Sequence, residues 1–132
     1  MPITRDDLRG YQRMKIALEE LDDEIRESYN TYRSPQFASD GSQKQLSANS
    51  PTERALRHTE ALEGKRDRLL KRMGTIDEYV DGIDDYLVQA IVRDHYIRGL
   101  TWEATCRHLR KHENKSSVIR LVDVYMEQRR QN

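Results

Sequence analysis

The sequence predicts an all-α protein, in which an N-terminal antiparallel helical hairpin (a coiled coil) is joined to a C-terminal three-helix unit of the helix-turn-helix type. Only 36% of the 132 residues are apolar and 35% are charged. Long amphipathic helices suit that balance, because each needs only a narrow apolar stripe. Apolar residues alternate three and four apart in two long segments. After the second segment the apolar stripe widens, and Gly99 and Thr101 mark a tight turn between shorter helices.

The first long helix is expected to begin at Thr4, which is placed to cap it, with Asp6 and Asp7 in the first turn. It should end near Ser28. Its coiled-coil stripe consists of Tyr11, Met14, Leu18, Leu21 and Ile25. Residues 29–50 are rich in Ser, Asn, Gln, Gly and Pro and have no apolar period, so they predict a long disordered loop between two antiparallel helices.

The second long helix is expected to start with Ser50 as N-cap, Pro51 at the first helical position and Glu53 completing a capping box. Its stripe consists of Leu62, Arg66, Leu69, Met73, Ile76, Val80, Ile83 and Leu87. Three glycines, at positions 64, 74 and 82, suggest bending points. The last of them precedes Asp84 and Asp85, which indicates a break and a fresh cap. We therefore divide the chain into residues 1–83 and 84–132.

Three shorter helices are predicted in residues 84–132. The first carries an apolar stripe of Leu87, Val88, Ile91, Val92 and His95, and Gly99 is placed to end it. Thr101 is expected to cap the second, with an inward face of Trp102, Thr105, Cys106 and Leu109. We expect Cys106 to be the small side chain where the second helix meets the third. Ser116 or Ser117 is expected to cap the third, with Val118, Leu121, Val122 and Tyr125 inward.

This pattern is typical of a DNA-binding unit, in which the middle helix crosses the phosphate backbone and the third enters the major groove. A three-helix bundle without a ligand has the same pattern. Net charge is zero, but residues 1–28 carry five basic and eight acidic side chains, whereas residues 93–132 carry nine basic and five acidic ones. A basic end suits a local contact with a polyanion, although solvated helix faces also produce such an asymmetry.

The segments YIRGLTWEATCRHL (residues 96–109) and SSVIRLVDVYM (residues 116–126) resemble the C-terminal helix-turn-helix of bacterial sigma factors. They are most similar to RinA/ArpU-type phage transcriptional regulators. The matching positions are Tyr96, Ile97, Gly99, Trp102, Glu103, Leu109, Ser116, Val118 and Arg120. The resemblance implies a phage or prophage regulator of the late-gene activator type, with an N-terminal helical hairpin and a DNA-binding C-terminal unit.

The expected DNA contacts lie on the last two helices. Outward positions of the final helix are Lys115, Ser116, Ser117, Ile119, Arg120 and Asp123, and Arg107, Arg110 and Lys111 are candidates for phosphate contacts. Arg120 is the candidate for a bidentate contact with guanine. Asp123 lies beside it and is expected to pair with it on the surface, which would reduce its charge.

The sequence gives less support to a metal site or a catalytic site. Cys106, His108 and His112 lack a fourth zinc ligand nearby, and the acidic residues 77, 81, 84 and 85 lack the loop of a calcium site. That acidic block is instead a candidate surface for RNA polymerase. No Gly-rich phosphate loop, activated nucleophile or paired-carboxylate pocket is recognisable, so we expect neither an enzyme nor a cofactor.

The sequence also predicts where the protein acts and with what. A single cysteine, no run of eighteen apolar residues and no signal peptide predict a cytoplasmic protein that does not enter membranes. Double-stranded DNA is the expected partner, and the two coiled-coil stripes favour a homo-oligomer, with a dimer preferred. The alternatives are a small terminase subunit for DNA packaging and a helical adaptor that binds only protein.

Overall fold

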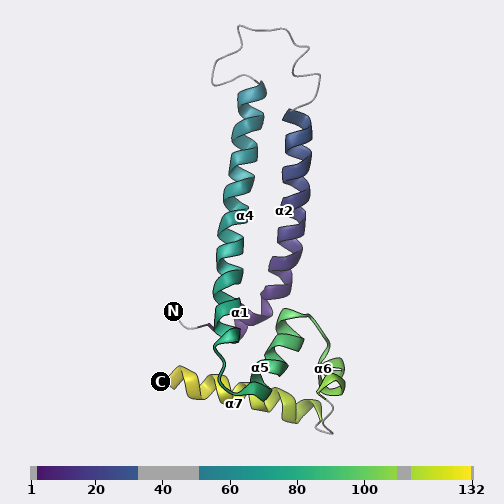
Figure 1. Cartoon of the computed structure of the whole chain (residues 1–132), viewed down its shortest axis with the longest axis vertical. Coiled ribbons are helices and arrows are strands. Elements are labelled where there is room, and N and C mark those ends of the chain that lie inside the picture. Colours follow the sequence, from purple (N-terminus) through teal and green to yellow (C-terminus); the bar gives the residue numbers. More distant parts are fainter. Residues whose placement is uncertain (1–2, 33–50, 110–113, 132) are drawn as a thin grey trace. The chain divides into compact units, whose positions relative to one another are not determined.

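The computed structural model describes residues 3–32, 51–109 and 114–131, and every regular element in these ranges is helical (Figure 1). The all-α class is therefore confirmed for the described part of the chain. In order, the elements are α1 (Arg5–Arg9), α2 (Tyr11–Tyr32), α4 (Pro51–Asp81), α5 (Tyr86–Val92), the π-helix η1 (Arg93–Ile97), α6 (Trp102–His108) and α7 (Lys115–Gln131). Within these ranges, no helix has the length and hydropathy needed to span a bilayer.

The first helix begins where the sequence predicts and is interrupted early. Thr4 Oγ1 accepts the N–H of Asp7 at 3.2 Å, and the Asp7 carboxylate accepts the N–H of Thr4 at 2.9 Å, which completes a capping box. Gly10 then separates α1 from α2, because a residue without Cβ stabilises a helix poorly. The prediction of an end near Ser28 is wrong: Ser28 is buried against the Thr59 hydroxyl, and α2 continues to Tyr32.

The second long helix starts at Pro51, as predicted, whereas the expected Ser50 cap lies outside the described residues. Of the predicted loop 29–50, residues 29–32 are helical, and the remainder also lies outside the description. Helix α4 runs without interruption through Gly64 and Gly74 and ends before Gly82. The Asp85 carboxylate accepts the N–H groups of Leu87 and Val88 at 3.0 and 3.2 Å, so the predicted break and fresh cap are confirmed.

The chain forms two compact units. One is Ile16–Lys71, which we call the helix pair, and the other joins Met1–Lys15 to Arg72–Asn132, which we call the composite unit. The ends of both long helices therefore group with the C-terminal helices, although the sequence suggested a boundary at residue 83.

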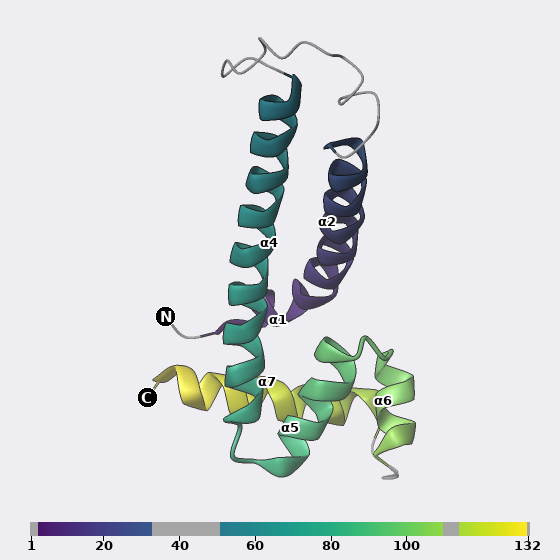
Figure 2. The same ribbon diagram turned by 45° about the horizontal axis from the view of Figure 1, so that its top comes forward.

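In the helix pair, α2 and α4 lie side by side and antiparallel (Figure 2). Their contact is partly polar. The hydroxyls of Ser28 and Thr59 are hydrogen-bonded to each other. Arg66 Nε donates to Asp22 Oδ1 at 2.6 Å, which accounts for the arginine in the predicted apolar stripe.

The composite unit contains most of the buried apolar side chains. Helix α5 contacts α7, α6 contacts both α7 and η1, and α1 contacts η1. The core consists of Leu8, Tyr11, Met73, Ile76, Val80, Ile83, Val88, Ile91, Val92, Tyr96, Val118, Val122 and Met126. Residues from both ends of the sequence therefore share one core, and this core positions α6 and α7.

Candidate nucleic-acid interface

The turn before α6 is built as its residue types predict. Arg98 ends the π-helix η1, and Gly99 follows with a φ of 80°, in the left-handed region that favours glycine. Thr101 Oγ1 then accepts the N–H of Ala104 at 3.1 Å, which confirms Thr101 as the N-cap of α6. The carbonyl oxygens of Tyr96 and Ile97, at the end of η1, both accept hydrogen bonds from Gln12 Nε2, at 2.8 and 2.7 Å.

An aromatic cluster fixes the first residue of α6. The imidazole of His95 stacks on the indole of Trp102, with ring centroids 3.6 Å apart and an interplanar angle of 18°. Tyr96 meets the same indole edge-on at 5.9 Å. His95 Nδ1 is 2.7 Å from the carbonyl oxygen of Leu100. Burial lowers the pKa of His95, and the Leu100 hydrogen bond partly opposes this shift. The neutral imidazole is therefore favoured in this cluster.

Asp94 connects η1 to the end of α6 through its carboxylate. The sequence did not predict this role. Its side chain is only 3% exposed and accepts from Arg98 Nη1 at 2.8 Å. Its second oxygen lies 2.5 Å from His108 Nδ1. The available signal was its position three residues after Ile91, which places an acidic residue on the inward face of the helix.

Helix α7 packs on α5 and α6 through Val118, Val122 and Met126, which are at most 9% exposed. Its cap is Asn114, whose Oδ1 accepts the N–H of Ser117 at 2.8 Å. The predicted caps Ser116 and Ser117 are therefore wrong, because the helix begins earlier, at Lys115.

The predicted inward face of α6 is buried unequally. Thr105 is completely buried, whereas Cys106 is only half-buried. Thr105 Oγ1 donates to the Thr101 carbonyl at 2.9 Å. A β-branched hydroxyl residue is accommodated there because its polar atom is satisfied within its own helix.

The predicted DNA contacts fall into three groups. Arg107, Ser116, Ser117 and Arg120 are exposed, at the end of α6 and in the first two turns of α7. Lys115 forms an ion pair with Glu103 at 3.4 Å, and Ile119 is half-buried. Arg110 and Lys111 lie outside the described residues.

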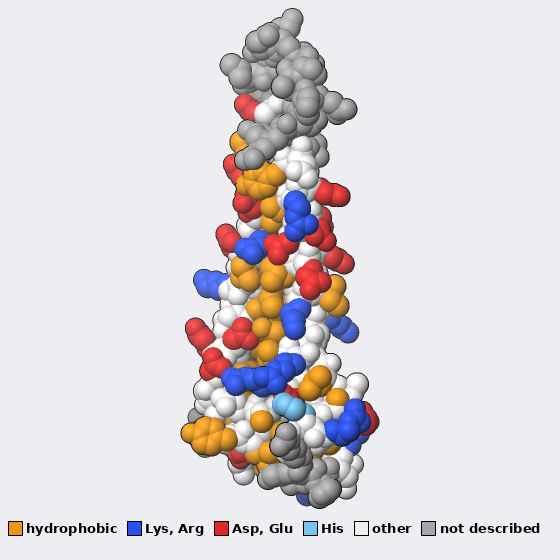
Figure 3. Space-filling view, turned by 45° about the vertical axis from the view of Figure 1, so that its right-hand side comes forward, with side chains coloured by type: hydrophobic (Ala, Val, Ile, Leu, Met, Phe, Trp, Pro, Cys, Tyr) orange, Lys and Arg blue, Asp and Glu red, His pale blue; other side chains and the backbone are white. Residues whose placement is uncertain are grey.

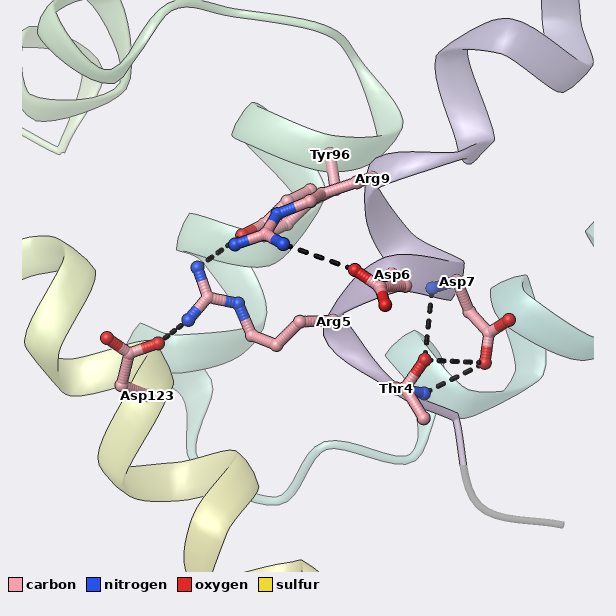
Figure 4. A network of polar contacts seen from close by, with 7 residues as sticks. All are labelled: Thr4, Arg5, Asp6, Asp7, Arg9, Tyr96 and Asp123. Carbon is pink, nitrogen blue, oxygen red and sulfur yellow. Dashed lines mark hydrogen bonds and ion pairs between the residues drawn. The ribbon is translucent and has the colours of Figure 1, made fainter.

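Asp123 has a different partner from the one expected. Its carboxylate forms an ion pair with Arg5, not with Arg120, and Arg5 Nη2 also donates to the Tyr96 hydroxyl at 2.9 Å (Figure 4). Arg120 itself has no hydrogen-bond or ion-pair partner among the residues that the structure describes. The positive charge of Arg120 is therefore left available at the surface of α7.

Three carboxylates of the acidic block before α5 are each engaged by a different residue of the chain. Tyr11 donates to Asp77 at 2.9 Å, and Arg93 pairs with Asp81 at 2.6 Å. Asp84 is bound by Arg129, whose hydrogen bond lowers the pKa of the Asp84 carboxyl. In the described ranges, no three His, Cys, Asp or Glu side chains gather as a metal site requires. His108 is engaged by Asp94, and His112 lies outside the description.

An open groove of about 440 Å³ runs beside the exposed face of α7. Ser117, Arg120, Val124 and Gln128 line it from α7, and Asp85 lines it from the start of α5. The side chains of Ser117, Arg120, Gln128 and Asp85 can donate or accept hydrogen bonds, but they do not combine a nucleophile with a positioned base. The groove is therefore suited to binding the surface of a partner molecule.

Comparison with known proteins adds no relative: no family model, no curated protein and no solved structure matches this chain.

Proposed function

We propose that residues 84–132 act as a helix-turn-helix that binds double-stranded DNA, and that the protein is a transcriptional regulator of the phage type. Helix α7 is the recognition helix, and α6 crosses the phosphate backbone. The sequence resemblance and the local geometry of the turn both support this assignment. Thr101 caps α6 directly after the Gly99 turn, and α6 packs against α7.

The observation that carries the proposal is the exposed start of α7. Val118 and Val122 point into the core, so Ser116, Ser117 and Arg120 remain on the solvent side. Short hydroxyl side chains beside a helix N-terminus suit phosphate oxygens. An arginine one turn further along has the reach and the fork geometry for a guanine edge.

The ion pairs within the composite unit also favour DNA binding at the exposed face of α7. Asp81, Asp84, Asp94 and Asp123 are each bound by an arginine, so four carboxylates that would repel phosphate are neutralised by internal partners. Arg120 is not used in these pairs, and its charge remains for a partner outside the chain.

The experiment is a titration of the full chain against labelled fragments of its native replicon, at two salt concentrations and with excess competitor DNA. Arg120→Ala should weaken binding to the preferred fragment by about tenfold to a hundredfold, as expected for loss of a bidentate base contact. Binding to unrelated DNA should change much less. Arg54→Ala, an exposed arginine of the helix pair, is the matched control and should leave both affinities unchanged.

Each outcome decides between functions. A fragment that survives competition, and that depends on Arg120, supports a sequence-specific regulator. Weak binding to every fragment, lost with modest salt, would leave only phosphate contacts and favour a packaging role. No binding at either salt concentration would overturn the proposal and favour an adaptor that binds protein.

A further inference from the structure

The face of α7 that carries Arg120 also exposes an apolar side chain. Val124 lies one helical turn beyond Arg120 on the same side of the helix and is 47% exposed. Elsewhere on the surface, hydrophobic side chains form a column along α2 and α4, bordered by charged groups (Figure 3). Among the described residues of the composite unit, the exposed large apolar side chains are Tyr86 and Val124. Val124 is therefore the exposed large apolar side chain of the proposed recognition helix.

Val124 forms part of the groove beside α7. Two further apolar residues line this groove, Val88 from α5 and Leu121 from α7. Val88 is 2% exposed and Leu121 is half-buried, so the apolar lining continues from the core to Val124 at the surface. Arg120 and Gln128 line the same groove and are exposed. The groove therefore offers an apolar surface next to groups that form hydrogen bonds.

The charges around the groove indicate which part of a DNA duplex it can receive. Arg120 is cationic, but Asp85 also lines the groove, and Glu127 is exposed in the same stretch of α7. Carboxylates repel phosphates, so beyond the first turns of α7 the sugar–phosphate backbone is a poor occupant. Base edges in the major groove present hydrogen-bond donors, acceptors and, on thymine, a methyl group. The mixed lining of the groove is therefore better matched to base edges than to phosphates.

We propose that Val124 contacts the C5-methyl group of a thymine, which lies about two base pairs from the guanine assigned to Arg120. Such a contact rests on the proposed function, because it specifies part of the DNA sequence that α7 reads. Thymine is the one base that presents a methyl group in the major groove. Val124 therefore favours thymine over cytosine at this position, because cytosine has no methyl group to bury.

The spacing between the two contacts follows from helix geometry. Residues four apart are separated by about 6 Å along a helix axis, and successive base pairs by about 3.4 Å along the duplex. A helix that lies along the major groove therefore places Val124 about two base pairs from the contact of Arg120.

The test removes the methyl group without changing the base pairing. In the shortest duplex that keeps the full affinity for the chain, each thymine is replaced in turn by deoxyuridine, and the dissociation constant is measured by fluorescence anisotropy. The uracil effect is the ratio of the dissociation constants with and without the replacement. At one position of the recognised sequence it should be about fourfold, as expected for one methyl group that is no longer buried. In Val124→Ala the same replacement should have no effect, and this variant should bind the parent duplex about fourfold more weakly.

Two further variants serve as controls. Val124→Ile keeps an apolar side chain at this position and should keep the uracil effect. Tyr86 is exposed but does not line the groove, so Tyr86→Ala should also keep the uracil effect, whatever it does to the overall affinity. Alanine favours helix more than valine does, so Val124→Ala should leave α7 folded, which circular dichroism checks.

The outcomes separate the thymine contact from the proposed function. A uracil effect that is absent at every position, or equally large in Val124→Ala, would overturn the thymine contact. Specific binding that still depends on Arg120 in that case would leave the proposed function standing. No specific binding to any fragment would overturn the proposed function and the thymine contact together.

Discussion

Replacing Gly99 by alanine tests how the turn before α6 is held. The φ of 80° at Gly99 lies in the left-handed region, where a Cβ costs about 1–2 kcal/mol. That Cβ would lie 2.8 Å from Gln12 Oε1, so the Gln12 amide has to move. Moving it breaks the two hydrogen bonds from Gln12 Nε2 to the carbonyls of Tyr96 and Ile97.

The expected loss of stability follows from these contacts. Each of the two hydrogen bonds contributes about 1 kcal/mol, and with the backbone cost Gly99→Ala should lower the free energy of unfolding by about 3 kcal/mol. Gln12→Ala alone should cost about 2 kcal/mol, because it removes only the two bonds. Truncating Gln12 removes the three atoms that lie nearest to the new methyl. The double variant should therefore cost about 3 kcal/mol instead of the additive value of about 5.

The assay is urea unfolding followed by fluorescence of Trp102, the one tryptophan of the chain, which stacks on His95 next to this turn. Gly74→Ala is the control, because a Cβ at that position of α4 meets nothing within 4 Å. It should stabilise the helix by up to about 1 kcal/mol. Additive costs for Gly99→Ala and Gln12→Ala would refute the reasoning, and so would a Gly99→Ala variant as stable as the parent.

Two further predictions concern Arg5 and His95. Arg5→Ala releases Asp123, whose carboxylate can then pair with Arg120, so DNA affinity at low salt should fall about three- to tenfold. Adding Asp123→Asn to Arg5→Ala should restore the DNA affinity. Arg9→Ala, in the same helix as Arg5, is the control and should have no effect. Failure of the Asp123→Asn rescue would contradict the argument. Burial lowers the pKa of His95 from 6.5, so the unfolded chain binds a proton more readily than the folded one, and stability should decline as the pH falls below about 6.5. Urea unfolding at several pH values should show a smaller decline in His95→Phe, and an equal decline in both proteins would be contrary evidence.

The sequence predicts helix starts well where the signal is local. Thr4, Asp85 and Thr101 each cap a helix through hydrogen bonds to residues two or three positions further along, and Pro51 starts α4. Such contacts depend on residue type and spacing alone. The cap of α7 was misplaced because Asn114, Ser116 and Ser117 all have side chains suited to the role. Packing of Val118 into the core selects the register.

Contacts between residues that are distant in the sequence could not be predicted, because no local sequence pattern specifies them. Arg5 and Asp123 are far apart in the sequence but form an ion pair, and Gln12 and the Tyr96 carbonyl are likewise distant but form a hydrogen bond. The sequence therefore predicts that Arg120 and Asp123 are neighbours on α7, but not that Arg5 removes Asp123 from that pairing. The deeper burial of Thr105 than of Cys106 has a similar origin, since their relative burial depends on how α6 is rotated against α7.

The contacts made by Arg5 and Gln12 extend the proposed DNA-binding unit beyond residues 84–132. Gly82 ends a helix, and a boundary there is natural from the sequence, yet α1 and the first turn of α2 supply side chains that hold η1 and α7. Leu8 and Tyr11 complete the same core from the N-terminal side. A unit cut at residue 84 would leave the carbonyls of η1 without the Gln12 amide and would return Asp123 to Arg120. The charge presented by α7, the proposed recognition helix, therefore depends partly on the first residues of the chain.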